Sequence, residues 1–393
     1  FFYALDKKTG KLLWKFLTGD VITASPIAVN EKVFIGSKDC HMYALDAKTG
    51  GLKWKFRTGG EIHSTILYSK GILYFGSYDH YLYALTEDGQ LLWKFKAGEI
   101  INGSMSCANG MIYFGSYDRY FYAVDGDGFL RWKFFTGGFV DTRPLLANKE
   151  SSVSSFRQRI CDLNSDAETV YFGSFDGYFY SLNAISGSLK WKFRTGDVIA
   201  WGSSALEEGK IYFASFDTHV YCLNMDGTLV WKFKTGDKID SSPFLYNGII
   251  DIGSNDCHVY ALNMNSGLLA WKFRCGGEVI SSPLVSNDVL YVGSMDSNLY
   301  ALSPTDGSIL WKFKIGSPIP AVTGLYKNAS EASKQIFIFW RPETKAAKID
   351  EKSFKVPSGF RVEYGAGVGY KQDDSYSLTT YGTQKKKKMP WEL

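Results

Sequence analysis

The sequence predicts an all-β protein, an eight-bladed β-propeller of four-stranded antiparallel blades. The first observation is a repeat, because the string Trp-Lys-Phe recurs at spacings of 40, 39, 39, 59, 40, 40 and 40 residues. The eight tryptophans are Trp14, Trp54, Trp93, Trp132, Trp191, Trp231, Trp271 and Trp311. The second is composition: 16% aromatic residues, 40 glycines and only 21% charged residues suit short strands joined by tight turns. A period near 40 residues with strand-like content is typical of a propeller or a solenoid.

One period, residues 19–59, contains four strand-like runs separated by turns, which is the content of one propeller blade. The runs are residues 21–29, 33–36, 41–45 and 52–57. In the last run, alternation places Trp54 and Phe56 on one face and basic residues on the other. Asp46 opens the turn before this run, and Gly50 supplies its positive φ.

Seven periods are complete, and the eighth is divided between the two ends of the chain. The N-terminal region supplies its last two strands, residues 2–5 and 12–16, and the C-terminal region supplies its first two, near residues 319–325 and 335–340. Two plus two strands complete one blade, which closes the ring and leaves no open sheet edge at that point. The propeller is therefore expected to span residues 1–340.

Three segments depart from the repeat. The fourth period is longer because residues 148–169, rich in Ser and charge, lie between its first two strands. A smaller insertion falls at residues 328–334, and both insertions are expected to be surface loops. Residues 341–393 form a C-terminal extension, expected to be extended or partly disordered, with a lysine run at 385–388 and one candidate strand at 360–364.

Composition excludes several functions. The net charge of +4 is too small to indicate a nucleic-acid partner, and no apolar run approaches the roughly 18–20 residues that span a bilayer. The chain begins at Phe1 and inside a repeat, so either a leader has been removed or the chain is a fragment. The spacing of the six cysteines argues against a zinc site and a disulfide ladder, and most are expected to be small buried apolar residues. They are Cys40, Cys107, Cys161, Cys222, Cys257 and Cys275.

Two sets of charged residues follow the repeat. Seven aspartates each close a turn after the second strand, where a carboxylate commonly accepts bonds from nearby amides, so a structural role is expected. They are Asp39, Asp79, Asp118, Asp176, Asp217, Asp256 and Asp296. Lysines and arginines flank the Trp-Lys-Phe core. We expect them to form a solvated perimeter that protects the strand edges. The alternative is a cationic belt for an acidic partner.

Positions that differ between repeats are the candidates for function. The first strand of each blade should line the central channel, four to six residues after a turn glycine. The residues there that break a Ser-rich background are His63, Asn102, Asp141, Arg143, Trp201 and Asp240. If they converge, they form a polar ligand pocket with one aromatic wall. The alternatives are an Asp141–Arg143 pair and an ordinary polar role for His63.

The string Ala-x-Asp-x-x-x-Gly-x-x-x-Trp is intact at residues 4–14 and 44–54. It resembles the tryptophan-docking motif of quinoprotein-type (PQQ-like) β-propellers, and the resemblance covers about residues 1–340. In that family each tryptophan stacks on the backbone of a neighbouring blade. Eight blades and short loops are most similar to the non-enzymatic BamB-type propellers.

The resemblance implies a non-catalytic scaffold or accessory propeller that binds protein partners within a larger assembly, with residues 148–169 and 341–393 as the contacts. It also implies no cofactor and an extracytoplasmic location, and a membrane-associated complex is one setting for such a protein. Two alternatives remain open: a PQQ-dependent dehydrogenase with calcium, and a small-ligand or saccharide sensor using the channel mouth.

The dehydrogenase alternative would need Asp141 or Asp240 as its base and Trp201 beside the quinone. Adjacent cysteines and long substrate loops, which such enzymes carry, are missing from the sequence. A Ser-His-Asp hydrolase is not indicated either, because no nucleophile-elbow motif is present.

Overall fold

The computed structural model describes residues 1–6, 11–148, 163–200, 202–314 and 335–339. Every helix or strand in these ranges is a β-strand. The chain divides into two units, Phe1–Ala347 and Lys348–Leu393, and all the strands belong to the first. The predicted boundary at residue 340 and the candidate strand at 360–364 fall outside the described residues.

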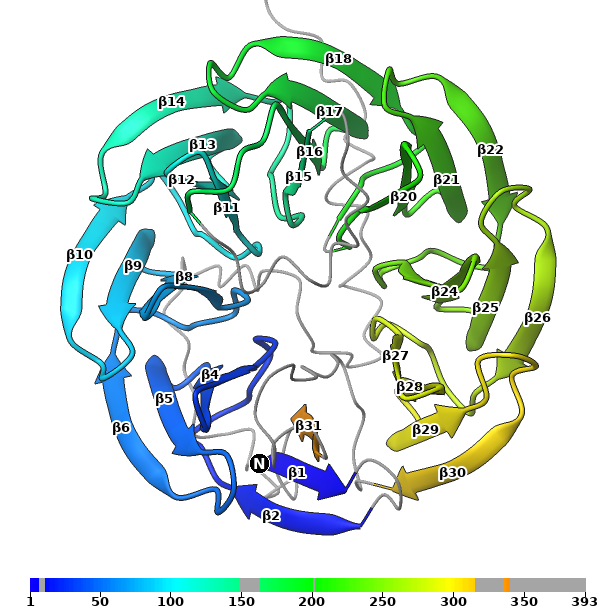
Figure 1. Ribbon diagram of the computed structural model, residues 1–393, viewed down its shortest axis with the longest axis horizontal. Coiled ribbons are helices and arrows are strands. Elements are labelled where there is room, and N and C mark those ends of the chain that lie inside the picture. The colour runs from blue at the N-terminus through cyan, green and yellow to red at the C-terminus, as the bar shows by residue number, and fades with distance from the viewer. Residues whose placement is uncertain (7–10, 149–162, 201, 315–334, 340–393) are drawn as a thin grey trace, which may run out of the picture. The chain divides into compact units, whose positions relative to one another are not determined.

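Seven sheets have four antiparallel strands each, arranged in sequence order from the centre of a ring to its perimeter (Figure 1). The innermost strands are β3 (Ile27–Val29), β7 (Leu67–Ser69), β11 (Ser106–Ala108), β15 (Leu145–Ala147), β19 (Ala205–Glu207), β23 (Phe244–Tyr246) and β27 (Leu284–Ser286). The second strands are β4 (Lys32–Gly36), β8 (Ile72–Gly76), β12 (Met111–Gly115), β16 (Thr169–Gly173), β20 (Lys210–Ala214), β24 (Ile249–Gly253) and β28 (Val289–Gly293).

The third and fourth strands complete these sheets. The third strands are β5 (His41–Asp46), β9 (Tyr81–Thr86), β13 (Tyr120–Asp125), β17 (Tyr178–Asn183), β21 (His219–Asn224), β25 (His258–Asn263) and β29 (Asn298–Leu302). The outermost strands are β6 (Leu52–Arg57), β10 (Leu91–Lys96), β14 (Leu130–Phe135), β18 (Leu189–Arg194), β22 (Leu229–Lys234), β26 (Leu269–Arg274) and β30 (Ile309–Lys314). The second and third strands are almost wholly buried, whereas the outermost strands alternate between exposed and half-buried residues.

The remaining sheet corrects the prediction of eight four-stranded blades. β1 (Phe2–Asp6) pairs antiparallel with β2 (Leu12–Phe16) on one side and with β31 (Gln335–Phe339) on the other. The described residues therefore form seven complete blades and one sheet of three strands. The fourth strand expected near residues 319–325 lies outside the described ranges. The pairing of β1 with β31 confirms that the two ends of the repeat region share a sheet.

The hydrophobic core lies between neighbouring blades. In one cluster, Phe34 and Met42 of the first complete blade pack with Ile66, Leu73 and Phe75 of the second, and all five side chains are fully buried. The other clusters pair blades in the same way around the ring. A blade therefore cannot bury its apolar faces without both neighbours, as expected of a repeat protein.

The repeated tryptophans contact the next blade. Trp132 Nε1 donates a hydrogen bond to the carbonyl of Ala184 at 3.2 Å. In the same turn Gly187, at φ 71°, lies so close that a Cβ there would be 2.7 Å from the indole. Only glycine tolerates both conditions. Six further tryptophan–carbonyl pairs repeat this bond: Trp14–Ala47, Trp54–Glu87, Trp93–Gly126, Trp191–Met225, Trp231–Met264 and Trp271–Pro304.

The innermost strands are shorter than the sequence predicted. The run at residues 21–29 was expected to be one strand, but only Ile27–Val29 is. In four other blades a hydroxyl before the innermost strand bonds to the backbone of the second strand, whereas Ala24, at the equivalent position here, has no hydroxyl. Ser64 Oγ accepts from Gly76 N at 2.7 Å and donates to Gly76 O at 2.9 Å, which occupies the backbone groups that a longer strand would pair. The same pair of bonds joins Thr142 to Gly173, Ser241 to Gly253 and Ser281 to Gly293.

The described end of the insertion predicted as a surface loop at residues 148–169 is mainly exposed, but it is hydrogen-bonded to the preceding blades. It packs on the preceding blade, where Gly110 N donates to Leu163 O at 2.6 Å. Asn109 and Ala167 exchange two further bonds, from Asn109 Nδ2 to Ala167 O and from Ala167 N to Asn109 Oδ1. Leu163 N also donates to Ser69 Oγ of the blade beyond, at 3.4 Å.

The cysteines differ in state. Cys222 and Cys275 are buried free thiols, as expected, and Cys40 and Cys257 are half-buried free thiols. Cys107 is 3% exposed and disulfide-bonded, which corrects the expectation of an unpaired apolar residue there. Cys161 lies outside the described residues.

Candidate functional site

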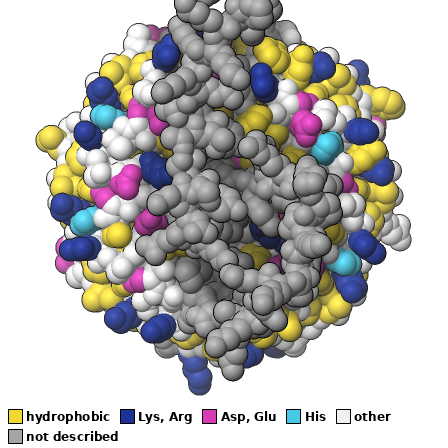
Figure 2. Space-filling view, turned by 180° about the vertical axis from the view of Figure 1, so that it is seen from behind, with side chains coloured by type: hydrophobic (Ala, Val, Ile, Leu, Met, Phe, Trp, Pro, Cys, Tyr) yellow, Lys and Arg dark blue, Asp and Glu magenta, His cyan; other side chains and the backbone are white. Residues whose placement is uncertain are grey.

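The five predicted site residues that the structure describes all lie in the connectors that lead from one outermost strand into the next blade. Each connector hydrogen-bonds to the turn after the second strand; Tyr78 N, for example, donates to Glu61 O at 2.9 Å. We call the connectors and these turns together the connector face. All five histidines of the chain lie in these segments or begin the third strands. The His side chains in Figure 2 therefore mark the face shown there as the connector face.

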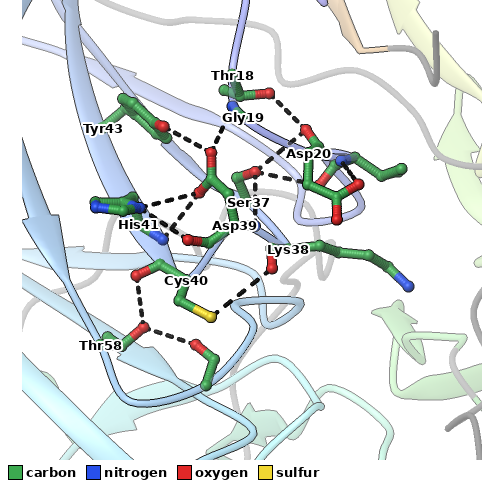
Figure 3. Close-up of polar contacts among 12 residues, drawn as sticks. Thr18, Gly19, Asp20, Ser37, Lys38, Asp39, Cys40, His41, Tyr43 and Thr58 are labelled. Carbon is green, nitrogen blue, oxygen red and sulfur yellow. Dashed lines mark hydrogen bonds and ion pairs between the residues drawn. The ribbon is translucent and has the colours of Figure 1, made fainter.

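The turn aspartates hold each connector in place, as Figure 3 shows for Asp39. Asp39 Oδ2 accepts hydrogen bonds from Gly19 N and from Tyr43 OH, both at 2.6 Å. Its Oδ1 accepts from His41 N at 3.0 Å. The bonds to connector glycine and tyrosine recur at Asp79, Asp118, Asp176, Asp217, Asp256 and Asp296. The structural role predicted for these carboxylates is confirmed.

His63 is anchored on both ring nitrogens. Its Nε2 lies 2.6 Å from Glu61 Oε2, and its Nδ1 lies 3.0 Å from Thr23 Oγ1 of the neighbouring blade. Because a carboxylate only accepts, Nε2 carries the proton, and the neutral ring then accepts from the threonine hydroxyl. Burial lowers the pKa of His63, which favours this neutral form, although the bond to Glu61 opposes the shift.

Asn102 and Asp141 meet across two blades. Asn102 Nδ2 donates to Asp141 Oδ2 at 2.7 Å, and Tyr117 OH donates to the same oxygen at 2.9 Å. Asp141 is 3% exposed, so these bonds stabilise a buried carboxylate. The structure thus joins two of the predicted residues directly and adds Tyr117, which the sequence reasoning did not single out.

Stacked aromatic rings extend this polar group. His63 stacks on Tyr78 with ring centroids 4.2 Å apart, and Tyr117 stacks on Phe139 at 4.8 Å. Phe139 in turn contacts Phe175 of its own blade at 5.9 Å. Burial raises the pKa of Tyr78, and the charge of Asp141 adds to the rise. These contacts therefore form two groups, one around His63 and Tyr78 and the other around Asn102, Tyr117 and Asp141.

The other predicted residues are less closely joined. Arg143 is 4% exposed and follows Asp141 by two residues, but the described contacts do not test the proposed pair. Trp201 lies outside the described residues. Asp240 accepts a hydrogen bond from Asn255 Nδ2 at 2.9 Å. Burial raises the pKa of Asp240 to about 6, and nearby Glu278 adds to the rise. No described contact joins Asp240 to His63.

Sequence reasoning missed the third residue of each Gly-Ser-x-Asp turn. This position holds Lys38, Tyr78, Tyr117, Phe175, Phe216, Asn255 and Met295. It varies between blades as strongly as the connector positions do. The same test of variation within the chain would therefore have found Tyr78, Tyr117 and Asn255.

The basic residues of the perimeter partly lie against aromatic rings. Lys94 Nζ sits 4.2 Å from the ring centroid of Tyr81, and Lys133 Nζ sits 4.2 Å from that of Tyr120. Lys192 repeats the contact on Tyr178. These cation–π contacts support the structural reading of the perimeter. Among the described residues, no three His, Cys, Asp or Glu side chains are grouped so that they could hold a metal ion, and no helix there could cross a membrane.

Ring architecture, repeats and inter-blade contacts define this protein as a PQQ-like β-propeller. A family model described as outer membrane protein assembly factor BamB matches residues 2–132, 62–197, 176–271 and 217–353. The chain therefore belongs to the BamB family.

Two solved structures are similar to the chain. The crystal structure of BamB from Moraxella catarrhalis has a TM-score of 0.65 at 15% sequence identity, covering 82% of this chain and 97% of that one. The computationally designed Ika8 protein has a TM-score of 0.67 at 14% identity, with the same coverage. At these identities the likeness shows the fold alone. A search of curated proteins gave no match.

Proposed function

We propose that this protein is a non-catalytic scaffold that binds protein partners in an assembly of the outer-membrane type. The observation that carries the proposal is the BamB family match, which extends over residues 2–353. Two features of the propeller also support it. Repeated contacts join the blades, and the residues that vary between blades lie on one face. Fold alone does not assign function, so the varied face and the family match bear the argument.

We also propose that the three-stranded sheet is the eighth blade, completed by the strand predicted near residues 319–325. In this proposal all eight tryptophans, Trp311 included, are docking residues. The seven tryptophan–carbonyl bonds and the β1–β31 pairing support it.

An extracytoplasmic location is part of the proposal. The family description refers to outer-membrane assembly. The disulfide at Cys107 adds independent support, because structural disulfides persist mainly in oxidising compartments.

The test is recovery of the assembly partner with tagged variants. We expect deletion of residues 150–160 or 341–393 to reduce recovery of outer-membrane assembly proteins, identified by mass spectrometry. The first deletion retains residues 163–168, because Leu163 and Ala167 pack on the preceding blade. A matched control replaces residues 150–160 with a Gly-Ser linker of equal length, which separates loss of sequence from loss of length. Unchanged recovery from both deletions would contradict the contact sites, and absence of any assembly protein in the intact sample would contradict the scaffold role.

A dehydrogenase would behave differently. The intact chain titrated with PQQ and calcium is expected to give no spectral change and no reduction of an acceptor dye. Dye reduction that depends on both additions would replace the scaffold proposal with the enzyme alternative.

A further inference from the structure

The connector face is acidic. The connectors of six blades carry a carboxylate near their start: Asp20, Glu61, Glu99, Asp197, Asp237 and Glu278. Asp141 and Asp240 add two further along, whereas the basic residues of the described connectors and turns are Lys38, Lys238, Arg119 and Arg143. Figure 2 shows this distribution, with Lys and Arg mainly at the margin and Asp and Glu nearer the centre. Such a surface attracts cations.

A second, independent observation is a set of buried acceptors without donors. Asn255 is 5% exposed, and its Oδ1 has no hydrogen-bond partner. Asp240 Oδ1, beside it, and Asn102 Oδ1, in the equivalent connector position three blades earlier, also have none. A buried acceptor left unpaired costs roughly 1–3 kcal/mol, so each of these atoms would gain from a bound donor. All three are acceptors, which points to a ligand rich in N–H groups.

Aromatic rings lie beside one of these side chains, because Asn102 Nδ2 donates to Tyr117 OH at 3.3 Å. Tyr78, Tyr117, Phe139 and Phe175 are half-buried on the same face. The faces of such rings attract ammonium and guanidinium groups. Carboxylates, unpaired acceptors and ring faces together favour a cation that carries several N–H donors.

The carboxylates recur in six connectors around the ring, which fits several cations carried on one extended chain rather than a single small cation. We propose that the connector face binds a lysine- or arginine-rich segment of a partner protein. This inference rests on the proposed scaffold function and specifies the chemistry of the partner.

The test measures binding of a fluorescent peptide of alternating lysine and serine to the intact chain by fluorescence anisotropy. In the double variant Asp240→Asn/Glu278→Gln, the affinity should fall about tenfold, because two carboxylates in one part of the face lose their charge. The matched control is Asp226→Asn/Asp306→Asn, which removes the same charge from two exposed turns outside the connector face. This control should bind as the parent does. All forms are also measured with Lys385–Lys388 replaced by serine, so that the lysine run of the chain itself cannot compete with the peptide.

A second variant guards against misfolding. Glu99→Gln/Glu278→Gln changes only an exposed and a half-buried side chain, and it should also bind more weakly. Equal binding by the parent, both connector-face variants and the control would overturn the proposal. Tighter binding of a glutamate–serine peptide than of the lysine–serine peptide would also overturn the proposal. If spermine binds as tightly as the lysine–serine peptide, the face is a site for a small polyamine instead. If the peptide does not bind but the assembly partner is still recovered, only the connector-face proposal is rejected. If the peptide binds but no assembly partner is recovered, only the scaffold role is rejected.

Discussion

The contacts that join the blades and the variable positions of the connector face follow opposite rules. Two contacts recur from blade to blade: a tryptophan of the outermost strand on the next turn, and a turn aspartate that holds a tyrosine and a connector amide. On the connector face, equivalent positions hold Thr23, His63, Asn102, Asp141, Ala200, Asp240 and Ile280. Repetition therefore marks what joins the blades, and variation marks what one blade alone presents.

One buried position breaks the first rule. The middle of the second strand is an aromatic residue that contacts the blade's tryptophan in six blades, for example Tyr171 with Trp191 at 5.7 Å. In β24 the position is Asp251, fully buried, with neither carboxylate oxygen hydrogen-bonded. Burial raises the pKa of Asp251 to about 8. Substitutions at the repeated positions and at Asp251 can test this difference.

The largest effect is expected from Trp191→Ala, which should lower the free energy of unfolding by about 3–5 kcal/mol. The indole donates to Met225 O at 2.9 Å and lies against Gly227 of the next blade, so its loss opens an inter-blade cavity. Denaturant unfolding followed by fluorescence measures the change. Leu189→Ala, on the same strand but 46% exposed, is the control and should cost far less. Equal losses would show that the tryptophan does not join the blades.

Asp251 should make stability depend on pH. Because burial raises the pKa of Asp251 from an ordinary 3.8 to about 8 in the folded chain, the carboxyl group does not destabilise the fold below pH 4. Its destabilising effect grows as the pH rises toward 8. Relative to Asp251→Asn, which does not titrate, the parent should lose on the order of 3–4 kcal/mol between pH 4 and pH 7. Thermal unfolding across that range measures the difference. Asp251→Tyr restores the repeated residue and should exceed both in stability; parallel pH curves for parent and Asn variant would reject the prediction.

A smaller effect is expected at the turn aspartates. Tyr122→Phe removes the donor to Asp118 Oδ2, a 2.5 Å bond, and should cost about 1–2 kcal/mol. Tyr120→Phe keeps the ring under Lys133 and should change stability by less than about 0.5 kcal/mol. Chemical denaturation of the pair measures both values. A null result at Tyr122 would mean that the bond to Asp118 adds little to the blade junction.

The sequence was sufficient for the repeated part of this fold, because Trp-Lys-Phe and the turn glycines impose both strand position and inter-blade contact. It placed the innermost strands too early, since the hydroxyls of Ser64 and Ser241 take up backbone groups that the apolar pattern cannot reveal. The disulfide at Cys107 was missed, because pairing depends on contacts distant in sequence.

The site could be predicted only in part. Variation within the chain selected Asn102 and Asp141, which hydrogen-bond to each other, and His63, which stacks on Tyr78. It did not indicate Tyr117, because the turn that carries it looked purely structural. Asp251 is a lone charge in the apolar run Ile249–Gly253, and this signal could have marked it. It was missed because charged residues were compared only where they recur in the repeat.

The pairing of β1 with β31 has a consequence during synthesis on the ribosome. β1 is made before its partner, which begins at residue 335, so one edge of this sheet stays unpaired until the other seven blades have been made. Loop closure over such a length costs little more than over a short one, yet it comes last. Until then the chain is an open arc with an unpaired strand edge, and that interval is when aggregation or chaperone capture competes with folding.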